Sequence, residues 1–166
     1  MMKAFDVSAG MFVRGLGNLK TMLDKAEAHA TATGIEPRAL LGAQLAGDMN
    51  DLASQVHWAS EGAKLAVHRL LGSSFAPAAA AAQSFADLHE RIDAALAALR
   101  AVDPDALEAG LARTIELPHR GATKTFTGER FLTEFAIPNF FFHFTTAYAI
   151  LRHNGVPLQK GDFLGP

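Results

Sequence analysis

Histidine side chains carry most of the chemistry that this chain could perform. The sequence contains seven of them in 166 residues. It contains no cysteine, which excludes disulfides, thiolate catalysis, iron–sulfur clusters and cysteine-ligated zinc. An imidazole transfers protons near neutral pH and is also a common metal ligand. Which histidines matter depends on which of them the helices turn inward.

The first stretch with candidate histidines is a predicted helix that Asp48 caps and that runs to about Leu71. At 100° per residue from Leu52, the apolar residues gather within about 40° of that position. His57 falls at about 140°, among charged and polar side chains. That composition is typical of a solvent-exposed face, so His57 and His68 are predicted on the surface.

The second stretch is a predicted helix over 138–153, in which Phe140 marks the apolar face. His143 lies about 60° from Phe140, so the geometry turns it inward. Asn139 lies one turn earlier on the same flank. Gln55, at the margin of the other helix's stripe, needs a hydrogen-bond partner because an unsatisfied buried amide costs about 1–3 kcal/mol.

These three side chains permit two interpretations. One is a structural core histidine satisfied by an amide or carbonyl group. The other is a polar pocket in which Gln55, Asn139 and His143 converge from facing helices. The other four histidines are predicted off the apolar stripes or in a loop: His29, His89, His119 and His153.

The elements that must position these residues form an all-α single domain over 1–166. Long helices are predicted over 8–31, 48–71, 138–153 and from residue 85, where Ser84 and Asp87 form a capping box. Four amphipathic helices favour a four-helix bundle. Gly15 and Gly17 inside the first helix indicate a close backbone contact.

The connecting segments carry smaller elements. Short helices are predicted at Pro37, after Asp103 and over 129–136, and a hairpin is predicted from RTIEL and KTFTG. The segment 73–83 is a low-complexity loop. Pro138 is predicted to interrupt the helix and to push Ile137 out of helical geometry. The tail from residue 156 is predicted extended, with Phe163 and Leu164 against the helices.

Composition excludes several classes of function. Fifteen basic and seventeen acidic side chains give a formal charge of −2, which is too balanced for a nucleic-acid binder. The uncharged stretch between Glu134 and Arg152 includes polar residues that are costly in lipid, so we expect a buried helix, no membrane partner and a cytoplasmic protein.

Phe142 points away from the main stripe of its predicted helix. We expect it to pack on the hairpin or tail, to line a pocket or to lie in a subunit interface.

The segments PNFFFHFTTAYAILRHNGVPLQKGDFLG and GDMNDLASQVHWASEGAK resemble an uncharacterised bacterial domain-of-unknown-function family. That family is grouped with the DinB/YfiT-like four-helix bundles, and the resemblance covers nearly the whole chain. It implies a metal site made of one histidine on the second helix and an i, i+4 pair on the fourth. His143 matches the last of these and Asn139 its partner. The third position falls at or near Gln55, with His57 as an imperfect substitute.

The resemblance therefore implies a divalent metal, zinc or nickel, with His143 as its ligand, at a site where two positions have become amides. Three functions stay open at this point. The first is small-molecule binding in a polar pocket that is degenerate relative to the three-histidine site. The second is a metal-dependent hydrolase or thiol transferase. The third is a homodimer with a structural or interaction role. Whether the protein is an enzyme is left open.

Overall fold

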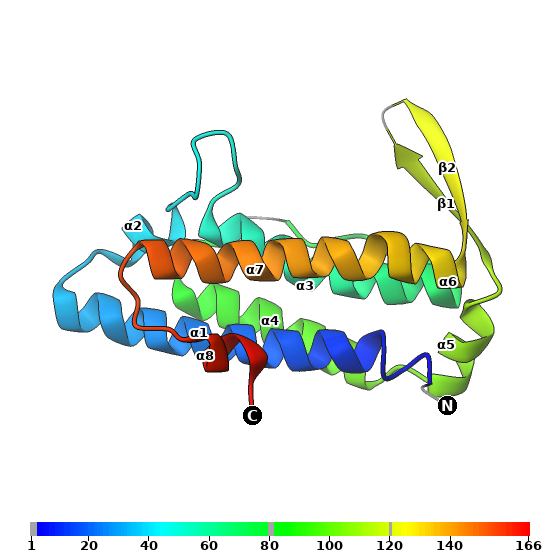
Figure 1. Cartoon of the computed structure of the whole chain (residues 1–166), viewed down its shortest axis with the longest axis horizontal. Coiled ribbons are helices and arrows are strands. Elements are labelled where there is room, and N and C mark those ends of the chain that lie inside the picture. The colour runs from blue at the N-terminus through cyan, green and yellow to red at the C-terminus, as the bar shows by residue number, and fades with distance from the viewer. Residues whose placement is uncertain (1–2, 80–81, 120) are drawn as a thin grey trace.

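The structure, a computed structural model, describes residues 3–79, 82–119 and 121–166, apart from the side chain of His119. The chain is mostly helical and has one two-stranded antiparallel sheet in the described part. The longest helices lie side by side along the long axis of the molecule (Figure 1). These are α1 (Ala9–Thr33), α3 (Leu52–Leu71), α4 (Phe85–Arg100) and α7 (Ile137–His153).

Helix α3 is the most enclosed of the long helices. It packs against α7, α4 and α1, whereas α1 packs against α4, α7 and the C-terminal helix α8 (Lys160–Leu164). The apolar stripes predicted from helical spacing form the core, with Phe12, Leu16, Val56 and Phe140 almost fully buried. Because α3 has neighbours on several sides, more than one of its faces is removed from water.

Helix α1 ends where the sequence predicts, at Gly34, which adopts a left-handed conformation with φ of 70°. Within the helix, the prediction of a close contact is confirmed at Gly15. A Cβ atom at Gly15 would lie 2.6 Å from the Phe140 ring of α7. The prediction is wrong at Gly17, where a Cβ atom would meet no atom within 4 Å.

The start of α3 differs from the prediction. Asp51, and not Asp48, caps the helix, and its carboxylate accepts a hydrogen bond from the Ser54 backbone N–H at 2.8 Å. Asp48 lies in the loop that follows α2 (Pro37–Leu41). Both aspartates suit an N-cap, and the sequence pattern alone does not tell them apart. The capping box of Ser84 and Asp87 at the start of α4 is confirmed.

Pro138 does not interrupt the helical path, contrary to the prediction. A short helix α6 (Gly128–Phe131) continues through a π-helical turn, η1 (Leu132–Ala136), directly into α7. Ile137 keeps helical angles, with φ −63° and ψ −52°. A proline normally clashes with the carbonyl four residues earlier, and the wider π turn just before Pro138 relieves that clash.

The connecting elements lie at the two ends of the long helices. Helix α5 (Pro104–Gly110) leads into a hairpin of β1 (Thr114–His119) and β2 (Ala122–Thr127), which is confirmed and pairs Ile115 with Phe126. The hairpin projects away from the helices (Figure 1). The tail is not fully extended, because it forms α8. There Phe163 stacks on Phe144 with ring centroids 4.3 Å apart, while Leu164 stays half-exposed.

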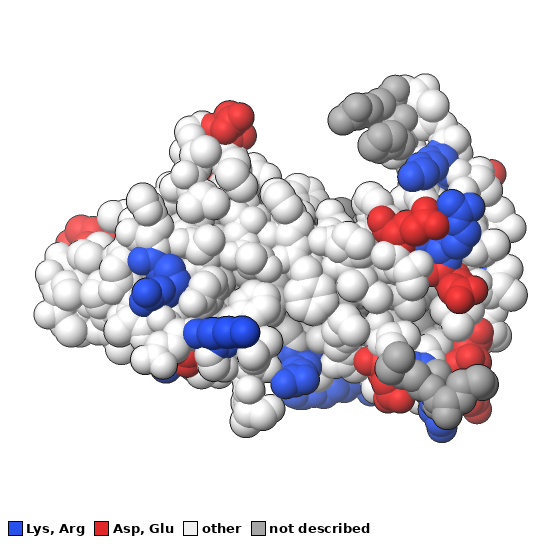
Figure 2. Space-filling view, viewed as in Figure 1, with Lys and Arg blue, Asp and Glu red and all other residues white. Residues whose placement is uncertain are grey.

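Charged side chains are interspersed in sign on the face seen in Figure 2, and a broad uncharged area covers its middle. Helix α7 runs across that area in the same view (Figure 1), and its sequence has no charged residue before Arg152. No helix within the described residues is long and apolar enough to cross a membrane.

Candidate functional site

His143 on α7 and Gln55 on α3 lie face to face. The Nδ1 atom of His143 is 2.8 Å from Oε1 of Gln55, and the Gln55 Nε2 donates to the carbonyl oxygen of Asn50 at 3.0 Å. Gln55 is buried and His143 is half-buried. The structure therefore brings together two of the three residues that the sequence places in a polar pocket.

This contact determines which ring nitrogen of the neutral His143 imidazole carries the proton. Gln55 directs its amide nitrogen to a backbone carbonyl, so its oxygen faces His143 and can only accept a hydrogen bond. The proton of the neutral imidazole must then reside on Nδ1. Burial lowers the pKa of His143 below its ordinary value, which favours the neutral ring at pH 7. Nε2 is left as a hydrogen-bond acceptor.

Asn139 occupies the turn of α7 before His143 and lines the same cavity. Its Nδ2 atom lies beside α3 at Gly62, where a Cβ atom would come within 3.2 Å of it. Its side chain makes no hydrogen bond to any residue that the structure describes. The absence of a side chain at Gly62 therefore gives the amide room between the two helices.

The cavity beside these residues has a volume of about 220 Å³. It lies between α3, the α6–η1–α7 segment and the connector after α3, of which Pro77 forms part of the wall. Most of the wall is apolar, including Trp58, Leu65, Phe131 and Phe135. Phe131 and Phe135 stack with ring centroids 5.8 Å apart. The polar groups in the wall are His143, Asn139, Glu61 and Arg69.

His57 is not on the surface, contrary to the prediction. Its exposed fraction is 2%, and its Nδ1 atom accepts a hydrogen bond from Nη1 of Arg91 on α4 at 2.7 Å. Burial and the neighbouring Arg91 charge lower the pKa of His57, so the neutral ring is favoured. The helical-wheel argument assumed one buried face, whereas α3 packs against both α4 and α7.

Glu61 is a buried carboxylate that sequence reasoning also missed. Its Oε2 accepts a hydrogen bond from the Ala78 backbone N–H at 3.0 Å, and its Oε1 lies 2.7 Å from Nζ of Lys64. Arg91 donates to the carbonyl oxygen of Ala79 at 2.8 Å. These contacts fasten residues 78–79 of the connector to α3 and α4. The spacing from His57 to Glu61 was a local signal, but nothing local pointed to Arg91.

The remaining histidines do not line the cavity beside His143. His153 is exposed, as predicted, and His29 is half-buried. His68 is half-buried, with Nδ1 2.7 Å from Oγ of Ser73 and its ring stacked on Phe75. His89 lies 3.4 Å from Asp24. His119 ends β1, and its side chain lies outside the described part of the chain.

The donor set does not fit the zinc or nickel ion that the family resemblance implies. At the three positions, one imidazole stands with two neutral amides, which are poor ligands for these metals. The Nδ1 atom of that imidazole is already hydrogen-bonded to Gln55. Within the described residues, no group of three or more histidine, aspartate or glutamate side chains is arranged to hold a metal ion. This donor set therefore does not support chemistry that runs through a zinc or nickel ion.

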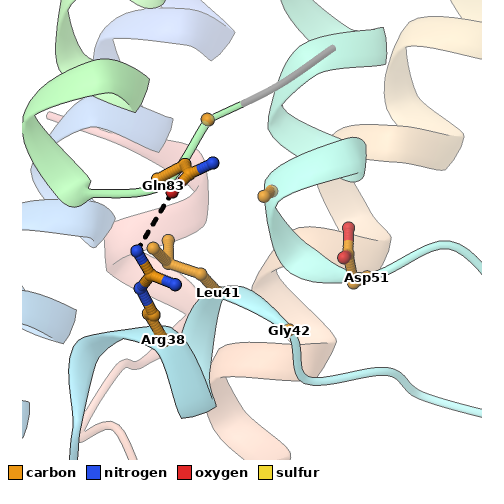
Figure 3. A pocket seen from close by; sticks show the side chains of 7 residues that line it. Arg38, Leu41, Gly42, Asp51 and Gln83 are labelled. Atoms are coloured by element: carbon orange, nitrogen blue, oxygen red, sulfur yellow. Dashed lines mark hydrogen bonds between the residues drawn. The ribbon is translucent and has the colours of Figure 1, made fainter.

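A second hollow, of about 240 Å³, lies between α2, the start of α3 and the residues before α4 (Figure 3). Its polar groups are already engaged. Arg38 donates to Oε1 of Gln83 at 3.0 Å, and Asp51 caps α3. It is lined by fewer apolar side chains than the cavity beside His143 and has no aromatic wall. The cavity beside His143 is the better candidate for a ligand site.

The fold is that of a DinB-like helical domain. A crystal structure of a DinB family member protein from Shewanella denitrificans matches with a TM-score of 0.92 and 36% sequence identity, and the match covers 98% of this chain and 92% of that chain. Residues 4–164 match the family described as "Domain of unknown function (DUF1993)", and the chain belongs to this family. A search of curated proteins found no match. The resemblance to an uncharacterised DinB-like family is thereby confirmed.

Proposed function

We propose that this protein binds a small, mainly apolar molecule in the cavity beside His143, without a metal. In this proposal α1, α3, α4 and α7 form a four-helix bundle. The cavity lies beside the three-histidine site implied for the superfamily, where Gln55 and Asn139 stand in place of two histidines. Asn139 and His143 line the cavity, and Gln55 contacts it only through His143. The observation that carries the proposal is the cavity itself, which has an aromatic wall and a half-buried imidazole at its edge.

The dimensions limit the ligand to about one ring. A cavity of about 150 Å³ in another protein holds benzene, so about 220 Å³ accommodates a single ring with a short substituent. Drug-sized ligands occupy larger pockets, of roughly 300–1,000 Å³. Trp58 and Phe135 line the cavity and are 41% and 40% exposed, so a ligand covering them gains further apolar burial.

The test uses Trp58, which is the single tryptophan of the chain. Titration with toluene should change its fluorescence in a saturable way, because the ring enters the cavity that Trp58 lines. Ala66→Met extends a side chain into the cavity from a buried wall position and should weaken binding at least about tenfold. Ala97→Met, at an exposed position of α4, is the matched control and should bind as the native protein does. A native titration without saturation would remove the proposal.

A second candidate function is self-association, favoured by the exposed side of α7. Phe142 on this side is 55% exposed, and it lies between exposed Pro138 and Thr145 at helical spacing. No charge interrupts this side before Arg152. We propose a homodimer through this stripe, which sedimentation velocity tests.

A further inference from the structure

The inference concerns the chemical class of the ligand and rests on the binding function proposed above. Three groups in series determine which hydrogen bond the cavity can offer. The Asn50 carbonyl orients the Gln55 amide, the Gln55 oxygen holds the proton of His143 on Nδ1, and Nε2 is left as an acceptor. Gln55 is therefore a positioning residue that acts through His143.

The Nε2 atom of His143 has no hydrogen-bond partner among the residues that the structure describes. Nε2 is also not fully buried, because it is not one of the fully buried side-chain atoms of the described chain that lack a hydrogen-bond partner. His143 lines the cavity, and the Nδ1 edge of its ring faces Gln55. Nε2 is thus the polar atom that this imidazole has left for a ligand or for water.

We infer that the cavity selects an uncharged ring compound bearing a hydroxyl or N–H donor, such as a phenol, which donates to Nε2 of His143. An ether or a hydrocarbon of the same size has no proton to donate. A carboxylate likewise has none. The apolar wall binds the ring, and the imidazole discriminates among ring substituents.

Arg69 is the competing group in this wall. Its Nη1 donates to the carbonyl oxygen of Glu116 at 2.9 Å, while its Nε is buried without a partner in the described chain. If Arg69 rather than His143 selected the ligand, the cavity would prefer an anion. A ligand set that contains both a phenol and a carboxylate separates these two cases.

The experiment is isothermal titration calorimetry of the full chain with p-cresol, p-xylene and p-toluate. These compounds carry hydroxyl, methyl and carboxylate groups on the same methyl-substituted ring. One neutral hydrogen bond predicts that p-cresol binds about fivefold tighter than p-xylene, with p-toluate the weakest. Equal binding of p-cresol and p-xylene, or tighter binding of p-toluate, overturns the inference while leaving the proposed function intact. Failure of every ring compound to bind overturns the proposed function itself.

Variants locate the selectivity in His143. His143→Phe should reduce the ratio of p-xylene to p-cresol dissociation constants to about one, because the acceptor is gone. Gln55→Leu keeps the imidazole but releases its proton, so the ratio should also fall. His153→Phe, on the exposed part of α7, should keep the native ratio. An unchanged ratio in the first two variants contradicts the inference.

Nitrogen-15 NMR of the native protein provides a readout that does not depend on folding of the variants. The His143 ring should show a protonated Nδ1 and an unprotonated Nε2, and p-cresol should shift the Nε2 resonance more than p-xylene does. Protonation at Nε2 in the native protein would overturn the inference.

Discussion

His57 and His143 are both shielded from solvent in the folded protein, although the sequence around each of them differs. His143 pairs with Gln55 and borders the cavity, whereas His57 pairs with Arg91 and lies behind the connector. Both imidazoles have a lowered pKa, with burial as the main cause. Both rings are therefore favoured in the neutral form at neutral pH. Protonating either ring costs more free energy in the folded protein than in the unfolded chain.

This cost predicts that the protein loses stability in mild acid. The folded-state pKa values of His57 and His143 lie below the unfolded value of about 6.5, so the unfolded chain binds more protons as the pH falls. The stability they permit is complete above the unfolded pKa and is lost as the pH falls through the folded values. Urea denaturation between pH 7.5 and pH 5.5, roughly one unit on either side of that value, should show a falling free energy of unfolding.

Substitution identifies the groups responsible for this pH dependence. His57→Gln and His143→Gln should each reduce the slope of stability against pH, whereas exposed His153→Gln should keep it. The carboxyl groups of Asp87, Asp162 and Glu134 also have lowered pKa values, but they titrate at more acidic pH. A flat profile in the native protein would show that neither imidazole is protected from protonation.

The sequence predicted half of this residue-scale picture. Helical spacing on α7 turned His143 inward, and spacing on α3 put Gln55 at the margin of the apolar stripe, and the two side chains meet. His57 was misplaced because a helical wheel describes one partner surface, and α3 has several. The contact of His57 with Arg91 joins residues 34 positions apart, which no local pattern reveals.

At the scale of elements, the approach of α1 to α7 depends on the lack of a side chain at Gly15. Gly15→Ala would place a Cβ against the Phe140 ring, and overpacking of this kind costs about 1–3 kcal/mol. The gain in helix propensity offsets up to about 1 kcal/mol of it. With the full propensity gain subtracted, we expect a net loss of up to about 2 kcal/mol in the free energy of unfolding, measured by urea denaturation.

Gly17→Ala is the matched control in the same helix. A Cβ atom there meets nothing within 4 Å, so only the propensity term acts and stability should rise by up to about 1 kcal/mol. Equal effects of the two substitutions would mean that α1 can shift away from Phe140 at no cost. The sequence flagged both glycines alike, since the distinction lies in the facing helix.

Element boundaries show the same limit of local information. The capping box at Ser84 was predictable because both of its partners lie within four residues. The path through Pro138 was not, because the π turn that accommodates the proline depends on how η1 packs against α3 and α7. That path matters for the site, since η1 supplies Phe135 to the cavity and leads directly into the helix that holds Asn139 and His143.

For the whole molecule, the exposed aromatic residues gather around one feature. Trp58 and Phe135 both line the cavity, and the Phe142 ring lies 5.2 Å from that of His143, which also lines it. Helix α7, which carries Phe142 and His143, runs across the uncharged middle of the face in Figure 2. A partner that covers Phe142 would therefore also lie beside the ligand cavity. Self-association and ligand binding are then expected to influence each other.

We therefore predict that the protein forms a dimer in solution. Sedimentation velocity at micromolar concentration should show a dimer, and Phe142→Ser should shift it to monomer because the central apolar contact is lost. Leu164→Ser, at a residue of α8 that is also about half-exposed, is the control and should leave the dimer intact. Since Phe142 is exposed in the single chain, the substitution should leave the circular dichroism spectrum unchanged. A native protein that sediments as a monomer would contradict the homodimer. The exposed aromatic residues beside the cavity would then be explained by ligand binding only.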